Sequence, residues 1–319
     1  MATWNLDPCR RTLHGVFSRD FSPVLTVDSG DTVVYQTLEA GWGFEPRNPW
    51  DANHKRRTFD DWIPERRGDG HCLVGPVAIH GAEVGMTLEV RVDEVIVGDW
   101  GWTGCWSGPI SEPVGVKDGE WDYLVWSLDA ERKVGRNRFG HEVDLRPFMG
   151  VMGMPPSEPG THSTIPPRRT GGNLDCKELI AGTSLFLPIE VEGGLFSMGD
   201  GHAVQGDGEV SGTAIECPME RVAVTLILHT DMPLESPRAR IHGAWITFGV
   251  DEDLDQAAFA AVNDMVSLLV DRHSISRSAA LALASVAVDL RVTQYVNRVK
   301  GVHAILRDST IRISQASSS

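Results

Sequence analysis

Polar side chains that could bind a metal ion or transfer a proton are concentrated in one glycine-rich stretch, residues 199–209. Four glycines are interspersed there with five polar residues, namely Asp200, His202, Gln205, Asp207 and Glu209. Glycine has no β-carbon, so the backbone can come close to a ligand or to another strand. Because the stretch directly follows an apolar run, residues 194–198, we expect these side chains at the end of a strand rather than far out on a loop.

A second polar stretch, residues 171–175 (GGNLD), shares a spacing with the first. In an extended chain, residues i and i+2 point to the same face. This spacing occurs in three pairs: Asn173 with Asp175, Asp200 with His202, and Asp207 with Glu209. If the strands that carry these pairs are neighbours, the side chains converge on one point. The same residue types also form ordinary tight turns, which is the alternative interpretation.

Carboxylates and an imidazole in one place suit a divalent metal ion. A histidine nitrogen with carboxylate oxygens favours Zn²⁺, whereas an all-oxygen set suits Ca²⁺ or Mg²⁺. We therefore expect Asp175, Asp200 and His202 to hold an ion, with Zn²⁺ favoured. An ion with an open coordination position makes water a nucleophile near neutral pH and polarises an amide carbonyl. Glu209 and Asp207 are the candidates for transferring the water's proton.

The elements that must position these residues are short strands. The 33 glycines and 18 prolines separate β-type runs, which favours a mainly β fold over residues 1–250, a β-sandwich or a partly open barrel. Residues 23–28 and 32–36 flank a tight turn and indicate a hairpin. The proline-rich residues 149–170 predict a loop. Further strands are expected at residues 74–79, 87–97, 184–191 and 221–229.

The hydrophobic period changes towards the C-terminus. Apolar residues repeat there at helical spacing, with Asp251 or Asp253 as the N-cap of a first helix. A second helix is expected over residues 276–290, beginning at a serine cap. We therefore expect a C-terminal α+β lobe over residues 251–313 and a flexible tail over residues 314–319.

Charge and cysteine content limit the partners and the compartment. The net charge of −15 argues against nucleic acid and against an anionic membrane surface as partners. The sequence shows no secretory signal and no apolar run of about 18–20 residues, the length a membrane span needs. The cysteines are widely spaced and form no C-x-x-C pair, which predicts reduced thiols in the cytoplasm: Cys9, Cys72, Cys105, Cys176 and Cys217.

Several motifs follow one another along the chain, each weak alone and specific together. They are GVMGMP at residues 150–155, GGNLDCKE at 171–178, GDGHAVQGDGE at 199–209, TAIE at 213–216 and DLRVTQYVN at 289–297. From about His14 to His303, this series resembles the acetamidase/formamidase family. The resemblance implies a β-rich fold with a C-terminal α+β portion, hydrolysis of short linear amides to a carboxylic acid and ammonia, and a homo-oligomer, a dimer or larger.

The positions that match the family add three kinds of candidate. Asn173 and Gln205 would orient the amide substrate. His71 matches a histidine position of the family and is a further candidate metal ligand. Thr170 stands where many family members have a histidine, so we count it as a substrate contact. This departure supports one alternative, a hydrolase of a substituted or cyclic amide. A second alternative is a non-catalytic β-sandwich binding protein with a structural metal, which a closed coordination sphere would favour.

An irregular loop, residues 41–69, carries Trp42, Trp50 and Trp62 among charged residues. Aromatic rings give apolar cover with few torsions to restrict. The sequence allows two interpretations, a lid over the site or an interface with another subunit.

Overall fold

Strands dominate the computed structural model, which describes residues 1–46, 48 and 54–312. Within this part of the chain, nine strands form one sheet, called the main sheet below. Their order in space is β1 (Thr3–Leu6), β5 (Thr32–Thr37), β17 (Met219–His229), β7 (Thr87–Val97), β15 (Thr183–Pro188), β18 (Arg238–Ile241), β19 (Ala244–Asp251), β21 (Val299–Arg307) and β20 (Val288–Asn297). The expected mainly β fold is confirmed.

A second sheet carries the two polar stretches and is called the site sheet. Its order is β14 (Gly171–Asn173), β12 (Phe148–Gly153), β16 (Phe196–His202), β6 (Leu73–Ile79) and β2 (Leu13–His14), with β4 (Leu25–Val27) also paired to β6. Buried side chains of both sheets form one hydrophobic cluster, with Val33 and Val90 from the main sheet and Val77 and Phe196 from the site sheet. The two sheets therefore pack against each other, and the burial of apolar surface holds them together.

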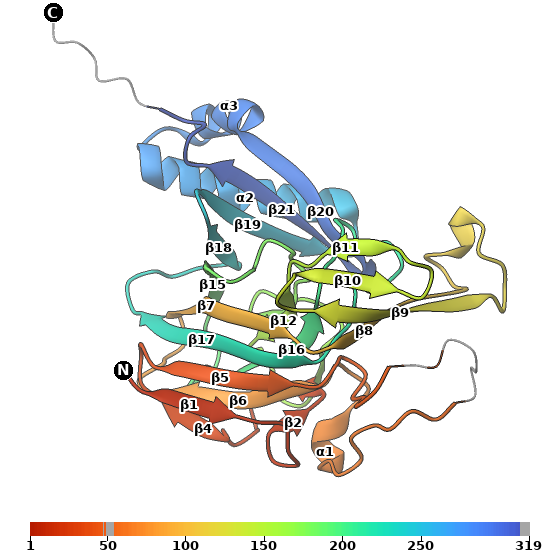
Figure 1. Cartoon of the computed structure of the whole chain (residues 1–319). Helices are drawn as coiled ribbons and strands as arrows, with labels where there is room; N and C mark the ends of the chain where they lie inside the picture. The colour runs from red at the N-terminus through yellow and green to blue at the C-terminus, as the bar shows by residue number, and fades with distance from the viewer. Residues whose placement is uncertain (47, 49–53, 313–319) are drawn as a thin grey trace, which may run out of the picture.

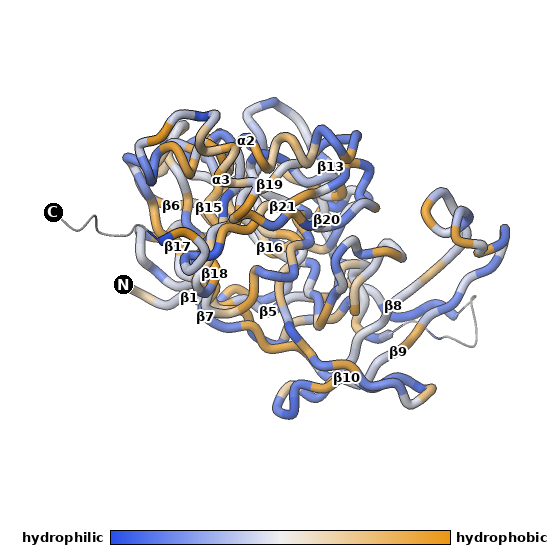
Figure 2. Tube along the Cα trace, turned by 90° about the horizontal axis from the view of Figure 1, so that it is seen from above, coloured by the Kyte–Doolittle hydropathy of each residue, from blue (hydrophilic) through white to orange (hydrophobic). Residues whose placement is uncertain are grey.

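A third sheet projects from this body, as Figures 1 and 2 both show for β8, β9 and β10. It contains β11 (Glu142–Asp144), β10 (Val134–Asn137), β9 (Trp121–Asp129) and β8 (Trp100–Trp106). The remaining short elements are the pair β3 (Val16–Phe17) and β13 (His162–Ser163), the helix α1 (Pro64–Arg67) and a 3₁₀ turn (Glu112–Val114). No helix among the described residues is long and apolar enough to cross a membrane.

The C-terminal segment adds two helices and two strands to the main sheet. Helices α2 (Leu254–His273) and α3 (Arg277–Ala287) cover β19, β21 and β20 (Figure 1). As expected, Asp253 caps α2 by accepting hydrogen bonds from two backbone N–H groups, and Ser276 caps α3. The second helix ends earlier than expected, at Ala287, because residues 288–290 already pair in β20. The expected tail, residues 314–319, lies outside the described residues.

Two sequence expectations in the body were wrong. The turn at residues 29–31 exists, but β4 pairs with β6 in the site sheet while β5 pairs with β1 and β17 in the main sheet. The chain therefore crosses between sheets at this turn, and the two strands do not form a hairpin. Residues 149–153, expected in a loop, belong to β12, because the prolines that exclude strand pairing begin only at Pro155.

Candidate metal centre and active site

Three neighbouring strands of the site sheet bring the two polar stretches together. β12 pairs with β14 on one side and with β16 on the other. Asp200 and His202 lie at the end of β16, and Asp175 follows β14. Gly150 of β12 lies between them. A β-carbon at Gly150 would lie 2.5 Å from Asp200 Oδ2 and 2.7 Å from Asp175 Oδ1, so a glycine is required for the side chains to meet.

The His202 ring is held in one orientation by Gln205. The Gln205 amide nitrogen donates to the Asp175 carbonyl oxygen at 2.7 Å, so its Oε1 accepts from His202 Nδ1 at 3.0 Å. This leaves His202 Nε2 facing two carboxylates, with Asp200 Oδ1 and Glu216 Oε2 each 3.3 Å away. Donor atoms around a tetrahedral zinc ion, at bonds of about 2.0–2.1 Å, lie about 3.4 Å apart. The His202 nitrogen is therefore separated from each of the two carboxylate oxygens as two ligands of one ion would be.

Two more carboxylates, Asp175 and Glu209, complete the cluster. Asp175 Oδ1 lies 4.0 Å from His202 Nδ1, and its Oδ2 accepts a hydrogen bond from the Asn297 amide. Possible ligand atoms form two overlapping groups, one of Asp175, Asp200 and His202 and one of His202, Glu209 and Glu216. All these side chains are less than 10% exposed.

The unpaired atoms of this cluster are all hydrogen-bond acceptors. Asn173 Oδ1, Asp175 Oδ1 and Glu216 Oε2 are buried and have no hydrogen-bond partner. Buried polar atoms without a partner are rare in folded proteins because each carries a desolvation cost. Since every unpaired atom is an oxygen acceptor, a cation or an N–H donor from a substrate would satisfy them. The residues present therefore fit a divalent metal ion.

Burial and mutual charge interactions shift the pKa values of the cluster residues strongly. Burial raises the pKa of Asp175 to about 7 and the pKa of Glu216 to about 8, and it also raises the pKa of Glu209. Burial opposes a charge on His202, but Glu216 and Asp200 together raise its pKa well above the usual range. Perturbed groups of this kind, gathered in a cavity, are typical of functional sites.

These shifts predict how the stability of the metal-free protein depends on pH. In the unfolded chain both carboxyls titrate near pH 4, whereas in the folded protein Asp175 and Glu216 keep protons up to about pH 7 and 8. The folded state therefore binds more protons between about pH 4 and pH 8, and the free energy of unfolding falls as the pH rises through this window. We expect Tm in the presence of a chelator to fall by roughly 5 °C between about pH 6 and pH 8.5. Excess Zn²⁺ should restore the Tm. A rise in the Tm of the metal-free protein over this pH range would contradict the raised pKa values of Asp175 and Glu216.

The backbone at the cluster is held in an unusual conformation. Asp175, Asp200 and Glu209 have positive φ angles of 48°, 59° and 50°. Residues other than glycine rarely adopt this left-handed region, and such strain is found mostly at functional sites.

The backbone at Glu209 also explains why Asp207 and Glu209 do not point to the same face, as their spacing predicted. The chain turns at residues 206–209 instead of extending, so Asp207 does not share a face with Glu209.

The cluster opens into a cavity of 390 Å³. Its wall includes His71, Trp42 and Arg67 from the loop at residues 41–71 and Trp102 and Trp106 from β8. The loop is anchored by Glu39 through an ion pair with Arg56, and Trp42 packs against Trp62 with Arg67 stacked over it. The base of the loop thus forms part of the cavity wall. Trp50 lies outside the described residues.

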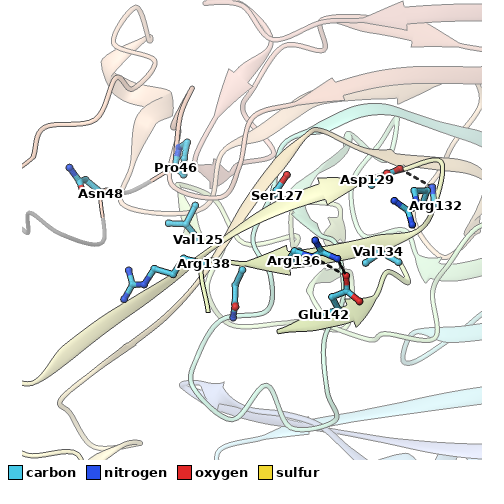
Figure 3. A pocket seen from close by; sticks show the side chains of 11 residues that line it. Pro46, Asn48, Val125, Ser127, Asp129, Arg132, Val134, Arg136, Arg138 and Glu142 are labelled. Atoms are coloured by element: carbon cyan, nitrogen blue, oxygen red, sulfur yellow. Dashed lines mark hydrogen bonds and ion pairs between the residues drawn. The ribbon is translucent and has the colours of Figure 1, made fainter. Parts of the chain in front are cut away.

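A larger hollow of 810 Å³ lies between β9, β10 and residues 46 and 48, as Figure 3 shows. Several of its charged side chains already have protein partners: Arg136 pairs with Glu142, Arg138 pairs with Asp122, and Asp129 accepts from the backbone N–H of Arg132. No histidine or cysteine is among the described residues that line it. The smaller cavity is therefore the better candidate for a catalytic site.

The structure brings together most, but not all, of the predicted site residues. Asn173, Asp175, Asp200, His202, Glu209 and His71 all line the cavity or the cluster. Gln205 lies behind His202 and does not line the cavity. Asp207 pairs with Lys177 at 3.0 Å, and the Thr170 hydroxyl donates to the Met154 carbonyl oxygen. The predicted catalytic role of Asp207 and the predicted substrate contact of Thr170 therefore have no geometric support.

Neither Glu216 nor Asn297 was singled out as a site residue from the sequence. Glu216 reaches the cluster because its backbone forms isolated β-bridges with Trp102 and with His202. Asn297 arrives from the end of β20. The signals in the sequence were the TAIE and DLRVTQYVN motifs, which contain these residues but do not reveal what they contact.

Comparison with known proteins is consistent with this geometry. The model of the Acetamidase/Formamidase family matches residues 5–163 and 160–306. An acetamidase from Mycolicibacterium smegmatis is 37% identical over 87 residues, 27% of this chain and 18% of that protein. A formamidase from Methylophilus methylotrophus is 50% identical over 48 residues, 15% of this chain and 12% of that protein. The crystal structure of an acetamidase from Bacillus halodurans is 26% identical, with a TM-score of 0.82 over 95% of this chain and 97% of that one.

Proposed function

Because the chain belongs to the acetamidase/formamidase family, we propose that it hydrolyses the C–N bond of a small linear amide, giving a carboxylic acid and ammonia, with a divalent metal ion as cofactor. The observation that carries this proposal is that His202 Nε2 lies 3.3 Å from both Asp200 Oδ1 and Glu216 Oε2, two carboxylates that line the cavity.

We infer that the ion is Zn²⁺ and that Asp200, His202 and Glu216 hold it. One nitrogen with an oxygen on either side at 3.3 Å matches the three protein ligands of catalytic zinc sites, whereas Ca²⁺ takes six to eight oxygens. Gln205 fixes His202 in the tautomer whose Nε2 lone pair is free for the ion. When bound, the ion would lower the pKa of a water molecule and polarise the amide carbonyl.

Glu209 is the residue we assign to proton transfer. It is buried beside Asp175 and lines the cavity, so it can reach a water molecule at the cluster. Its carboxylate would take a proton from water as the water oxygen bonds to the carbonyl carbon. When the C–N bond breaks, the same proton would pass to the nitrogen, which leaves as ammonia.

Asn173 is the residue we assign to holding the amide group. Its Nδ2 is fixed by the Ile165 carbonyl oxygen at 2.9 Å, so its Oδ1, which is buried and unpaired, is presented to the cavity. This oxygen would accept from the N–H₂ group of the substrate, which orients the carbonyl carbon towards water. Asp175 and Asn297 would hold the neighbouring wall through their hydrogen bond.

We also propose a cytoplasmic homo-oligomer, a dimer or larger. All five cysteines are unpaired, which suits a reducing compartment. Phe259, Leu281 and Val286 are exposed on α2 and α3, and an apolar groove of 550 Å³ lies between these helices and β20. Exposed apolar surface of this kind is typical of subunit contacts.

Ammonia release from formamide, acetamide and propionamide tests the proposed function. The full-length protein is assayed with added Zn²⁺ and, in parallel, after treatment with a chelator. We expect release with Zn²⁺ and loss of at least about 90% of it after chelation, because the ion supplies several kcal/mol of transition-state stabilisation. Release that is insensitive to chelation would contradict the role of the metal, and no release from folded, zinc-treated protein would contradict amide hydrolysis.

A further inference from the structure

An aromatic surface on β8 forms one side of the cavity. Trp102, Gly104 and Trp106 alternate along this strand, so all three face the same side. A β-carbon at Gly104 would lie 2.9 Å from Trp106 Cζ3 and 3.1 Å from Trp102 Cζ3. The ring of Tyr123, from the neighbouring strand β9, comes closest at 2.8 Å. Both indole rings and this ring therefore lie over the glycine, and only a residue without a side chain leaves room for them. We call Trp102, Gly104 and Trp106 the aromatic platform.

The aromatic platform begins directly at the metal centre. The backbone N–H of Trp102 donates to the carbonyl oxygen of Glu216 at 2.9 Å, and the N–H of Glu216 donates back at 2.8 Å. The indole N–H of Trp102 donates to Glu39 Oε2 at 3.0 Å, which fixes that ring. Trp106 lies four residues further along the strand, at about 3.3 Å per residue. The platform thus leads from the cluster towards the mouth of the cavity.

The cavity is larger than a short aliphatic amide requires. Acetamide has four non-hydrogen atoms and fills on the order of 100 Å³, at about 30 Å³ per atom, the share of a water molecule in the liquid. The cavity measures 390 Å³, which falls in the range of about 300–1,000 Å³ that holds drug-sized ligands. Trp106 remains 46% exposed although it lines this cavity. A bound acyl group of larger size would cover it.

We propose that the preferred substrate is a primary amide with an aromatic acyl group, such as phenylacetamide, whose ring lies on the aromatic platform. The proposal rests on the proposed function, since the amide group itself is held at Asn173 and the metal centre. Aromatic rings stack on indole in offset or edge-to-face geometry, and such contacts add to the gain from burying the ring. An aromatic substrate would make this ring contact in addition to the contacts of its amide group, which acetamide would also make.

The test compares phenylacetamide with acetamide for the zinc-loaded full-length enzyme and two variants. Trp106→Ala removes the outer part of the platform. Trp4→Ala is the matched control, because Trp4 lies on β1 of the main sheet, is 40% exposed and does not line the cavity. We expect the unmodified enzyme to show a kcat/KM for phenylacetamide roughly tenfold or more above that for acetamide, with Trp106→Ala lowering this ratio roughly tenfold and Trp4→Ala leaving it unchanged.

A preference for acetamide, or an equal change of the ratio in both variants, would overturn the inference. If neither amide is hydrolysed, the proposed function fails, and binding of phenylacetamide measured by calorimetry decides the inference separately. Weaker binding to Trp106→Ala than to Trp4→Ala would support the platform, and equal binding or none would refute it.

Discussion

Replacing His202 with alanine is expected to abolish zinc binding and to lower kcat/KM for acetamide roughly a thousandfold. His202 supplies the only nitrogen among the cluster residues that the structure places at the centre, and two carboxylates lie 3.3 Å from its Nε2. A bound ion is worth several kcal/mol in the transition state, and each 1.4 kcal/mol or so changes the rate tenfold. Zinc content measured by mass spectrometry and ammonia release measured on the same sample check both parts.

The control for this variant is His80→Ala. His80 is an exposed histidine that pairs with Asp28 at 2.9 Å and does not line the cavity. We expect this variant to keep its zinc and its activity. If His202→Ala retained one equivalent of zinc and near-normal activity, the assignment of the metal centre would be wrong, even though the family assignment would stand.

Replacing Glu209 with glutamine is expected to lower kcat while leaving the zinc content of the protein unchanged. Positioned acid–base groups contribute about a hundredfold to ten-thousandfold to the rate, so kcat should fall by this amount. The zinc content should stay near one equivalent, because Asp200, His202 and Glu216 remain in place. The contrasting variant is Glu216→Gln, for which we expect zinc and activity to be lost together.

The pH profile of the Glu209→Gln enzyme gives an independent readout. Loss of a group that must accept a proton should remove the acid limb of the kcat profile. A variant that retains this limb and most of its kcat would show that another group, such as Asp175, takes the proton. Loss of zinc from Glu209→Gln would instead make Glu209 a metal ligand.

Local spacing predicted the parts of the site that lie on strands. Asp200 and His202 both reach the cluster from β16, although Asp200 has a positive φ of 59°, and Asn173 lies at the end of β14. Their convergence followed from the pairing of β14 and β16 with β12. The pair Asp207 and Glu209 failed the same rule because the chain turns there, with Glu209 at a positive φ. The rule of alternating faces holds only where the backbone is extended.

Long-range contacts account for what sequence spacing could not predict. Glu216 meets His202 through a β-bridge that also joins Trp102, 114 residues earlier in the chain. Asn297 reaches Asp175 across 122 residues. The supposed hairpin at residues 29–31 failed for a related reason, because the choice of partner strand depends on packing between sheets and not on the turn. Helix caps, which depend on residues within one turn, were correctly located at Asp253 and Ser276.

Anomalous diffraction from crystals of the zinc-loaded protein, collected on both sides of the zinc absorption edge, locates the metal ion. We expect one strong zinc peak within about 2.0–2.2 Å of His202 Nε2 and of carboxylate oxygens of Asp200 and Glu216, with a further position open to the cavity. A peak at another place, or a zinc ion enclosed by four protein ligands with no open position, would contradict a catalytic metal centre at this site.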